Sequence, residues 1–114
     1  MDEKIVKLLF DIKMAISEID SFLSEKPVTI AYYRNNQQLK RAVERDLEII
    51  GEAVSKILSM ERNFPLENAR KITGLRNQII HAYDNISDEM IWSIVINHLP
   101  RLNREVDELL KSNS

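Results

Sequence analysis

The stretch GLRNQIIHAY, residues 74–83, carries most of the reactive side chains of an otherwise plain, helix-rich sequence. On an α-helix with about 100° between residues, Asn77 and His81 share one face, and Arg76 and Tyr83 nearly eclipse each other. The apolar side chains of the stretch point elsewhere and can seat it in a core: Leu75, Ile79, Ile80 and Ala82. The stretch therefore predicts a helix with one polar side and one buried side.

The separation between Arg76 and His81 suggests that one helix does not form a site alone. Five positions along a helix correspond to a divergence of about 140° and a rise of about 7.5 Å. The two side chains are then poorly placed to close on a single phosphate. A second copy of the helix can complete the site, so we expect a homodimer.

Upstream of this stretch, the pattern predicts two long helices. From Asp2 to Leu23 apolar residues recur at spacings of three and four, which is typical of one amphipathic helix. Thr29 is a plausible N-cap for a second helix that extends to about Leu58. Its apolar stripe comprises Leu39, Val43, Leu47, Ile50, Val54 and Ile57.

Downstream, a loop over residues 59–65 leads into the motif helix, which begins between residues 66 and 72 and ends near Asn85. Ser87, followed by two acidic residues, is a strong helix start, because a hydroxyl cap and carboxylates both favour the positive end of a helix. Pro100 removes a backbone donor, so a kink or a split is expected there. The last stripe comprises Met90, Ile91, Ile94, Val95, Leu99, Leu102, Val106 and Leu109.

Length and composition favour one all-α domain over residues 1–114. The 114 residues are 44% hydrophobic and 30% charged, with two glycines and three prolines, which argues against disorder or a β-sandwich. A chain of this length affords one core. We therefore predict a single antiparallel bundle of four to five helices.

Charge and the missing residue types exclude several classes of function. Without cysteine there is no disulfide, thiolate metal site or cysteine nucleophile, and no glycine-rich nucleotide loop or His–carboxylate metal cluster is present. No apolar run approaches the roughly 20 residues of a membrane span, so we expect a cytoplasmic protein. The net charge of −2 gives no global attraction to nucleic acid. The charge is uneven, however: four basic residues and one acidic residue occur between Arg62 and Tyr83, a composition compatible with a local basic surface near the motif.

The polar residues and the glycine that stand out in this sequence also have ordinary structural interpretations. His98 lies on an apolar stripe, which indicates packing, and Gly51 inside the second helix indicates close helix contact. The acidic row Glu44, Glu48 and Glu52 is typical of a solvated face, or it contacts a partner or an arginine. Arg76 can equally form a surface ion pair with this row, and Tyr83 can be an ordinary half-buried residue.

The pattern Arg76-Asn77-x-x-x-His81-x-Tyr83 resembles the R-x4-6-H motif of the HEPN superfamily, and the added tyrosine resembles its HepT branch. The similarity continues in RAVERDLEIIGEA, residues 41–53, and in YDNISDEMIW, residues 83–92. This resemblance implies a HEPN-like bundle with the motif on the third helix, in a homodimer. It also implies the toxin of a type VII-like toxin–antitoxin module, whose antitoxin is an MntA-like nucleotidyltransferase.

The resemblance further implies a metal-independent endoribonuclease without cofactor. The substrate's own 2′-hydroxyl is the nucleophile, His81 moves the proton, and Arg76 neutralises the pentacoordinate phosphorane. Asn77 supports them, and the antitoxin silences the enzyme by transferring AMP to Tyr83. In the alternative, the bundle is a non-catalytic docking partner and modification substrate of the nucleotidyltransferase. A purely structural adaptor leaves the basic motif unexplained.

Overall fold

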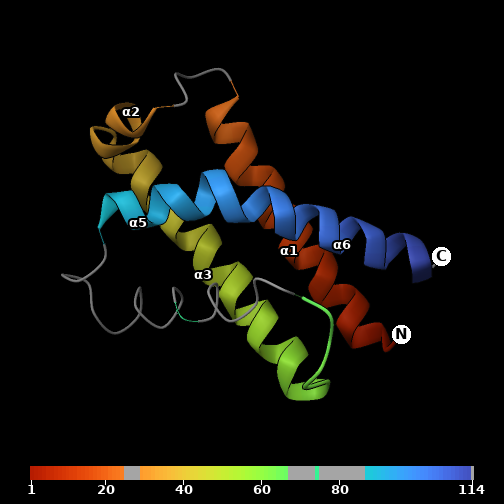
Figure 1. Ribbon diagram of the computed structural model, residues 1–114. Coiled ribbons are helices and arrows are strands. Elements are labelled where there is room, and N and C mark those ends of the chain that lie inside the picture. Colours follow the sequence, from red (N-terminus) through yellow and green to blue (C-terminus); the bar gives the residue numbers. More distant parts are fainter. Residues whose placement is uncertain (25–28, 67–73, 75–86, 114) are drawn as a thin grey trace.

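Two long helices, α1 (Glu3–Leu23) and α3 (Gln37–Met60), run in opposite directions and pack against each other at the centre of the fold (Figure 1). The computed structural model describes residues 1–24, 29–66, 74 and 87–113. Its described part is helical with short connections, which confirms the all-α bundle. The motif helix predicted within residues 66–85 falls almost entirely outside the described residues.

Helix α1 forms as its sequence pattern predicts. The Asp2 carboxylate accepts a hydrogen bond of 2.7 Å from the backbone N–H of Lys4 and caps the first turn. The apolar residues at spacings of three and four are buried in the core: Ile5, Leu9, Ile12, Ile16, Ile19 and Leu23. Burying each aliphatic side chain of this size stabilises the fold by roughly 1.5–3 kcal/mol, so this stripe determines which face of α1 packs inward.

The single helix predicted from Thr29 to Leu58 is wrong, because the chain breaks after one short helix. Thr29 does cap a helix, α2 (Ile30–Arg34), and its hydroxyl accepts a 3.1 Å hydrogen bond from the Tyr32 N–H. Asn36 then stands in an extended conformation and caps α3, its side-chain oxygen accepting a 3.0 Å hydrogen bond from Leu39. Asparagine competes for backbone donors in this way, which favours a cap over a continued helix. The predicted α3 stripe, Leu39 to Ile57, is buried, and so is Gly51.

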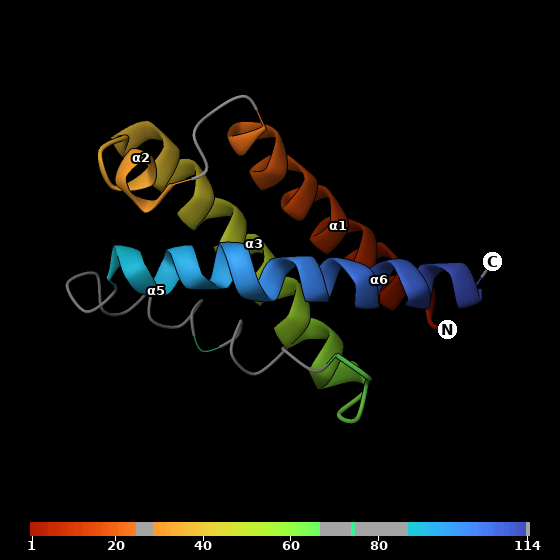
Figure 2. The same cartoon turned by 45° about the horizontal axis from the view of Figure 1, so that its top comes forward.

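The last part of the chain forms one continuous rod across the α1–α3 pair (Figures 1 and 2). It consists of α5 (Asp88–Ser93), a π-helical turn η2 (Ile94–His98) and α6 (Leu99–Asn113). The irregularity expected at Pro100 occurs just before it: the Leu99 N–H donates to the Ile94 carbonyl, five residues back. The wider turn shifts the hydrogen-bond register immediately before the residue that lacks a donor.

Helix α6 contacts α1 and completes the core on that side. Leu99, Leu102 and Val106 are buried, and Lys13 of α1 forms an ion pair with Asp107. Of the predicted final stripe, only Met90 is exposed. Residues from all the long helices therefore share one core.

Candidate functional site

The predicted catalytic residues Arg76, Asn77 and His81, and the predicted modification site Tyr83, all lie outside the described residues. The described structure instead defines the chain on both sides of them. On the entry side, Phe64 and Leu66 are buried in the core, and the Phe64 N–H donates to the Glu61 carbonyl at 3.1 Å. The short loop after α3 is thus held in the core directly before the motif segment.

On the exit side, Ser87 begins α5 as the sequence predicts. Its hydroxyl accepts a hydrogen bond of 3.1 Å from the Met90 N–H, and Asp88 and Glu89 occupy the first turn. Carboxylates in this position favour the helix start because they face its positive end. The first described residues after the motif therefore form a well-capped helix.

A group of ion pairs ties this helix start to α2 and α3. The Lys40 ammonium lies 3.1 Å from Asp88, and the Arg34 guanidinium lies 3.8 Å from Asp88 and also binds Glu89. Partly exposed ion pairs contribute little individually, but several that share a carboxylate hold the joined elements in one arrangement. The exit side of the motif segment is therefore held against the α2–α3 junction.

Beneath these ion pairs, an aromatic contact joins the same elements. The rings of Tyr33 and Trp92 lie 5.5 Å apart at an angle of 35°, and Tyr33 is completely buried. Burial raises the pKa of the Tyr33 phenol, and the negative charges of Glu44 and Asp88 raise it further. Tyr33 is therefore a neutral packing residue at physiological pH.

Glu44 of α3 is a titratable carboxyl in the same region, and its pKa is shifted. It is partly buried, which raises its pKa; Lys40 lowers the pKa, Asp88 raises it and Arg41 lowers it. The acidic row predicted as a solvated face is only partly so, since Glu52 is exposed whereas Glu44 and Glu48 are partly buried.

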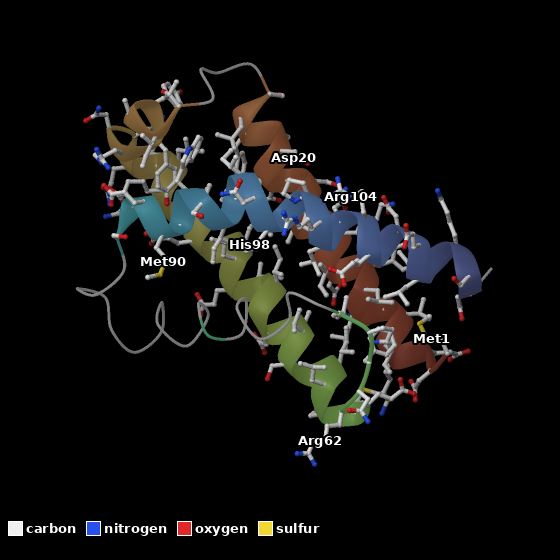
Figure 3. All side chains as sticks on the ribbon, in the orientation of Figure 1. Met1, Asp20, Arg62, Met90, His98 and Arg104 are labelled. Carbon is white, nitrogen blue, oxygen red and sulfur yellow. The ribbon has the colours of Figure 1, made fainter. Side chains whose placement is uncertain are left out.

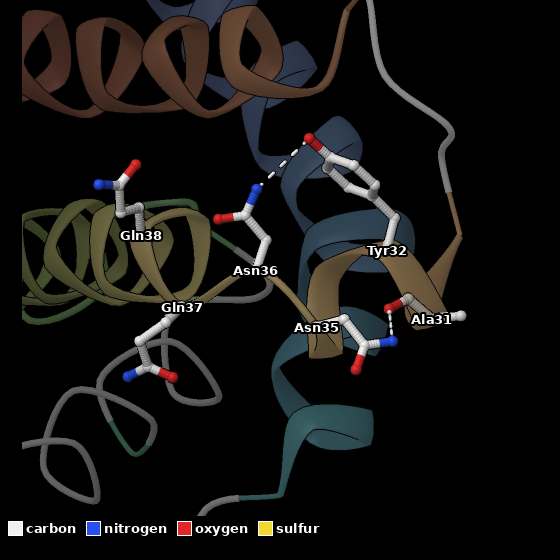
Figure 4. Close-up of a pocket in the computed structure, with 6 residues that line it drawn as sticks. All are labelled: Ala31, Tyr32, Asn35, Asn36, Gln37 and Gln38. Carbon is white, nitrogen blue, oxygen red and sulfur yellow. Dashed lines mark hydrogen bonds between the residues drawn. The ribbon is translucent and has the colours of Figure 1, made fainter.

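A hollow of about 490 Å³ lies at the α2–α3 junction (Figure 4). The Asn36 amide donates to the Tyr32 hydroxyl at 3.3 Å, and the Asn35 amide donates to the Ala31 carbonyl at 2.9 Å. The lining contains amides and one phenol but no charged side chain: Ala31, Tyr32, Asn35, Asn36, Gln37 and Gln38. The hollow can donate and accept hydrogen bonds, but its lining offers no group that exchanges protons near neutral pH.

His98 and Arg62, which the sequence also singled out, lie in the described part of the chain. His98 is partly buried at the end of η2, in keeping with its predicted packing role, and Arg62 is exposed and points away from the body (Figure 3). Within the described ranges, no cluster of three histidine or carboxylate side chains is arranged to hold a metal ion. None of the described helices is long and apolar enough to cross a membrane.

The sequence profile of the family described as "Ribonuclease HepT-like" matches residues 12–109, from the middle of α1 almost to the end of α6. The chain belongs to the HepT-like ribonuclease family. The match includes residues 74–83 and both further stretches that carry the resemblance. The predicted family and the predicted ribonuclease class are therefore confirmed.

Individual relatives of this HepT-like protein are similar over nearly their whole length. Two candidate RNases of Methanocaldococcus jannaschii are each 34% identical, one over 90% of this chain and 84% of its own, the other over 94% and 98%. A protein of Thermococcus cleftensis named probable ribonuclease HepT is 32% identical over 90% of this chain and 93% of its own. No solved structure gives a significant match.

Sequence reasoning missed one buried carboxylate of the HepT-like protein, Asp46. Although its side chain is acidic, it lies among the buried apolar residues of α3 and is only 3% exposed. Burial raises its pKa to about 7; a hydrogen bond and repulsion from Glu18 raise it as well, and Arg45 opposes the shift. An acidic residue three positions after Val43 and four before Ile50 was the signal in the sequence, because those spacings place it on the inward face.

Proposed function

We propose that this protein is a metal-independent endoribonuclease that acts in the cytoplasm as the toxin of a HepT/MntA-like toxin–antitoxin module. The observation that carries the proposal is the family match over residues 12–109, which spans the intact Arg76-Asn77-x-x-x-His81-x-Tyr83 pattern. Relatives named as RNases, matched over 84% and 93% of their own length, support the same activity class.

The proposed chemistry uses the RNA itself as nucleophile. His81 removes the proton from a ribose 2′-hydroxyl and the 2′-oxygen attacks the adjacent phosphorus. The bond to the 5′-oxygen then breaks as that oxygen takes the proton from His81, which returns to its neutral form. The products are a 2′,3′-cyclic phosphate and a 5′-hydroxyl. This route requires neither a metal nor a cofactor. Arg76 stabilises the additional negative charge of the phosphorane, and Asn77 orients His81 or a phosphate oxygen.

The proposed site is completed in a homodimer, because Arg76 and His81 diverge by about 140° on one helix. Arg76→Ala protein is mixed with His81→Ala protein and the subunits are allowed to exchange. The mixture is then expected to regain part of the cleavage, since some mixed dimers contain one intact Arg–His pair across the interface. Cleavage of a labelled RNA by the mixture is compared with that by each variant alone. A wild-type monomer at micromolar concentration in sedimentation contradicts the shared site.

Tyr83 is the proposed point of control by an MntA-like nucleotidyltransferase. AMP on its phenol adds bulk and a negative phosphate beside Arg76, so it blocks RNA and competes for the same guanidinium. Incubation with the cognate nucleotidyltransferase, ATP and magnesium is expected to attach AMP to Tyr83 and to abolish RNA cleavage. Intact mass and peptide fragmentation locate the adduct. A Tyr83→Phe variant that is still silenced through AMP on another residue contradicts this assignment.

The activity itself is tested by cleavage of a defined RNA with purified protein in the presence of EDTA. The net charge of −2 favours one competing function, since it gives the chain no general attraction to RNA. In that case the protein is a non-catalytic docking partner of the nucleotidyltransferase, and it binds and is modified without cleaving RNA. Absence of cleavage by folded wild-type protein, together with AMP transfer, selects this second function.

A further inference from the structure

A groove between α1 and α3 contains a buried charge that nothing in the proposed function uses. Its larger part is a hollow of about 230 Å³, and a smaller part of about 150 Å³ continues along the same helices, with Asp11 and Ile49 lining both. The larger hollow is lined by three carboxylates and three apolar side chains: Asp11, Glu18, Asp46, Met14, Ala15 and Ile49.

Asp46 lies in the wall of this hollow with an unsatisfied oxygen. The residue is 97% buried, and its Oδ2 atom has no hydrogen-bond partner among the described residues. Leaving a buried carboxylate without a partner is costly, and such groups are ordinarily paired or neutralised. Glu18 shares a hydrogen bond with this carboxyl, which leaves the Oδ2 atom, in the wall of the hollow, without a donor.

The lysines and arginines in the described part of the chain do not supply this donor. Lys7 is 2.9 Å from Asp11, and Lys56 is 3.3 Å from Glu52, so both lysines along the groove are already paired. Arg45 is close enough to lower the pKa of Asp46 but forms no ion pair with any described residue. Among the described residues, the groove thus has more carboxylate oxygens than cationic groups to pair with them.

Apolar side chains beside the hollow are unusually exposed. Met14 is 70% exposed, Phe10 one turn earlier is 49% exposed, and Ile49 across the groove is 38% exposed. Large apolar side chains that border a polar hollow are typical of surfaces that contact another protein.

We propose that this groove binds a partner protein through one arginine side chain, which enters the hollow between Asp46 and Glu18 while apolar residues of the partner cover Met14 and Ile49. Arginine fits because its guanidinium presents five donors in a plane, enough to serve several carboxylates at once. The proposal is independent of the ribonuclease function, because none of its residues belongs to the motif.

Other occupants fit the groove less well. The hollow is smaller than the roughly 300 Å³ at which small-molecule pockets begin, and the carboxylates around it are not arranged to hold a metal ion among the described residues. RNA is repelled by the same acids. A second copy of this chain packed by twofold symmetry sets this acidic face against itself, which like charges oppose.

The test is a titration of the full-length, isotope-labelled protein with a synthetic helical peptide of alanine and leucine that contains one central arginine. We expect backbone NMR shifts centred on Ala15, Asp46 and Ile49. A matched peptide with neutral citrulline in place of arginine is expected to bind at least about tenfold more weakly, because the charge-assisted hydrogen bonds are lost. Binding of the arginine peptide is also expected to weaken from pH 8 to pH 6, because the carboxyl of Asp46, whose pKa is raised to about 7 by burial and by Glu18 against the opposing charge of Arg45, takes up a proton over this range.

Two variants and one control decide the result. Asp46→Asn and Glu18→Gln are expected to weaken the arginine peptide about tenfold, whereas Glu108→Gln on exposed α6 leaves binding unchanged. Glu18 is exposed, so its variant keeps the test valid if Asp46→Asn does not fold. Equal binding of the arginine and citrulline peptides, or no binding of either at millimolar concentration, overturns the proposal. A self-association of wild type that Glu18→Gln abolishes assigns the groove to a second copy and overturns it as well.

Discussion

His81→Ala protein is expected to cleave RNA about 10²- to 10⁴-fold more slowly than wild type, because the reaction loses the group that moves the proton. Arg76→Ala is expected to lose activity by a similar factor, since the phosphorane then develops its charge without a fixed cation. Both rates are measured with a 5′-labelled RNA under single-turnover conditions in EDTA, so that metal-dependent contaminants do not contribute.

The chain offers a matched control for each variant. His98→Ala removes the other histidine, and Arg62→Ala removes an arginine that is exposed in the loop after α3. Both controls are expected to keep activity within a few-fold of wild type once helicity and melting temperature show that they are folded. Undiminished cleavage by His81→Ala and Arg76→Ala places the activity elsewhere or in a contaminant, and an equal loss in His98→Ala removes the special role of His81.

Asp46→Asn is expected to stabilise the fold at pH 8 and to lose that advantage at low pH. In the folded protein the pKa of Asp46 is raised to about 7, whereas its ordinary value is 3.8. Between these values the folded state keeps a proton that the unfolded state has released, so the stability of wild type falls as the pH rises through this window. Each pH unit contributes about 1.4 kcal/mol, which sets an upper bound of about 4 kcal/mol at pH 8.

The measurement is denaturant unfolding of wild type and Asp46→Asn at pH 4, 6 and 8. Glu52→Gln, at an exposed position on the same helix, serves as the control and is expected to show no such trend. Glu18→Gln is expected to flatten the dependence in wild type, because it removes the neighbouring negative charge. A stability difference between wild type and Asp46→Asn that stays constant with pH excludes a protonated Asp46 in the folded protein.

The sequence was sufficient wherever one face of a helix determines its packing. The stripes of α1 and α3 and the caps at Thr29 and Ser87 are local patterns, and the structure contains them as predicted. The family was also predictable, since the arginine, histidine and tyrosine of residues 74–83 occur at a specific spacing.

The features that were missed depend on parts of the chain that are distant in sequence or on competition between neighbours. Arg34 and Glu89 are 55 positions apart, and no pattern within either segment indicates that they meet. The break before α3 depends on the Asn36 side chain outcompeting a continued helix, a balance that propensity alone does not decide. The inward position of Asp46 follows from its spacing on the apolar stripe, but its raised pKa depends partly on Glu18 of α1, which is distant in sequence.

The ion pairs at the start of α5 have a further consequence for the geometry of the motif segment. The chain leaves α3 at Met60, is held in the core as far as Leu66, and is next held at Asp88, beside Lys40 near the other end of the same helix. At about 1.5 Å per residue, the helix between Lys40 and Met60 is roughly 30 Å long. Helix α3 is therefore a spacer, and its length determines how far apart the two ends of the motif segment are kept. Inserting or deleting a turn of α3 changes that span without altering any residue of the motif.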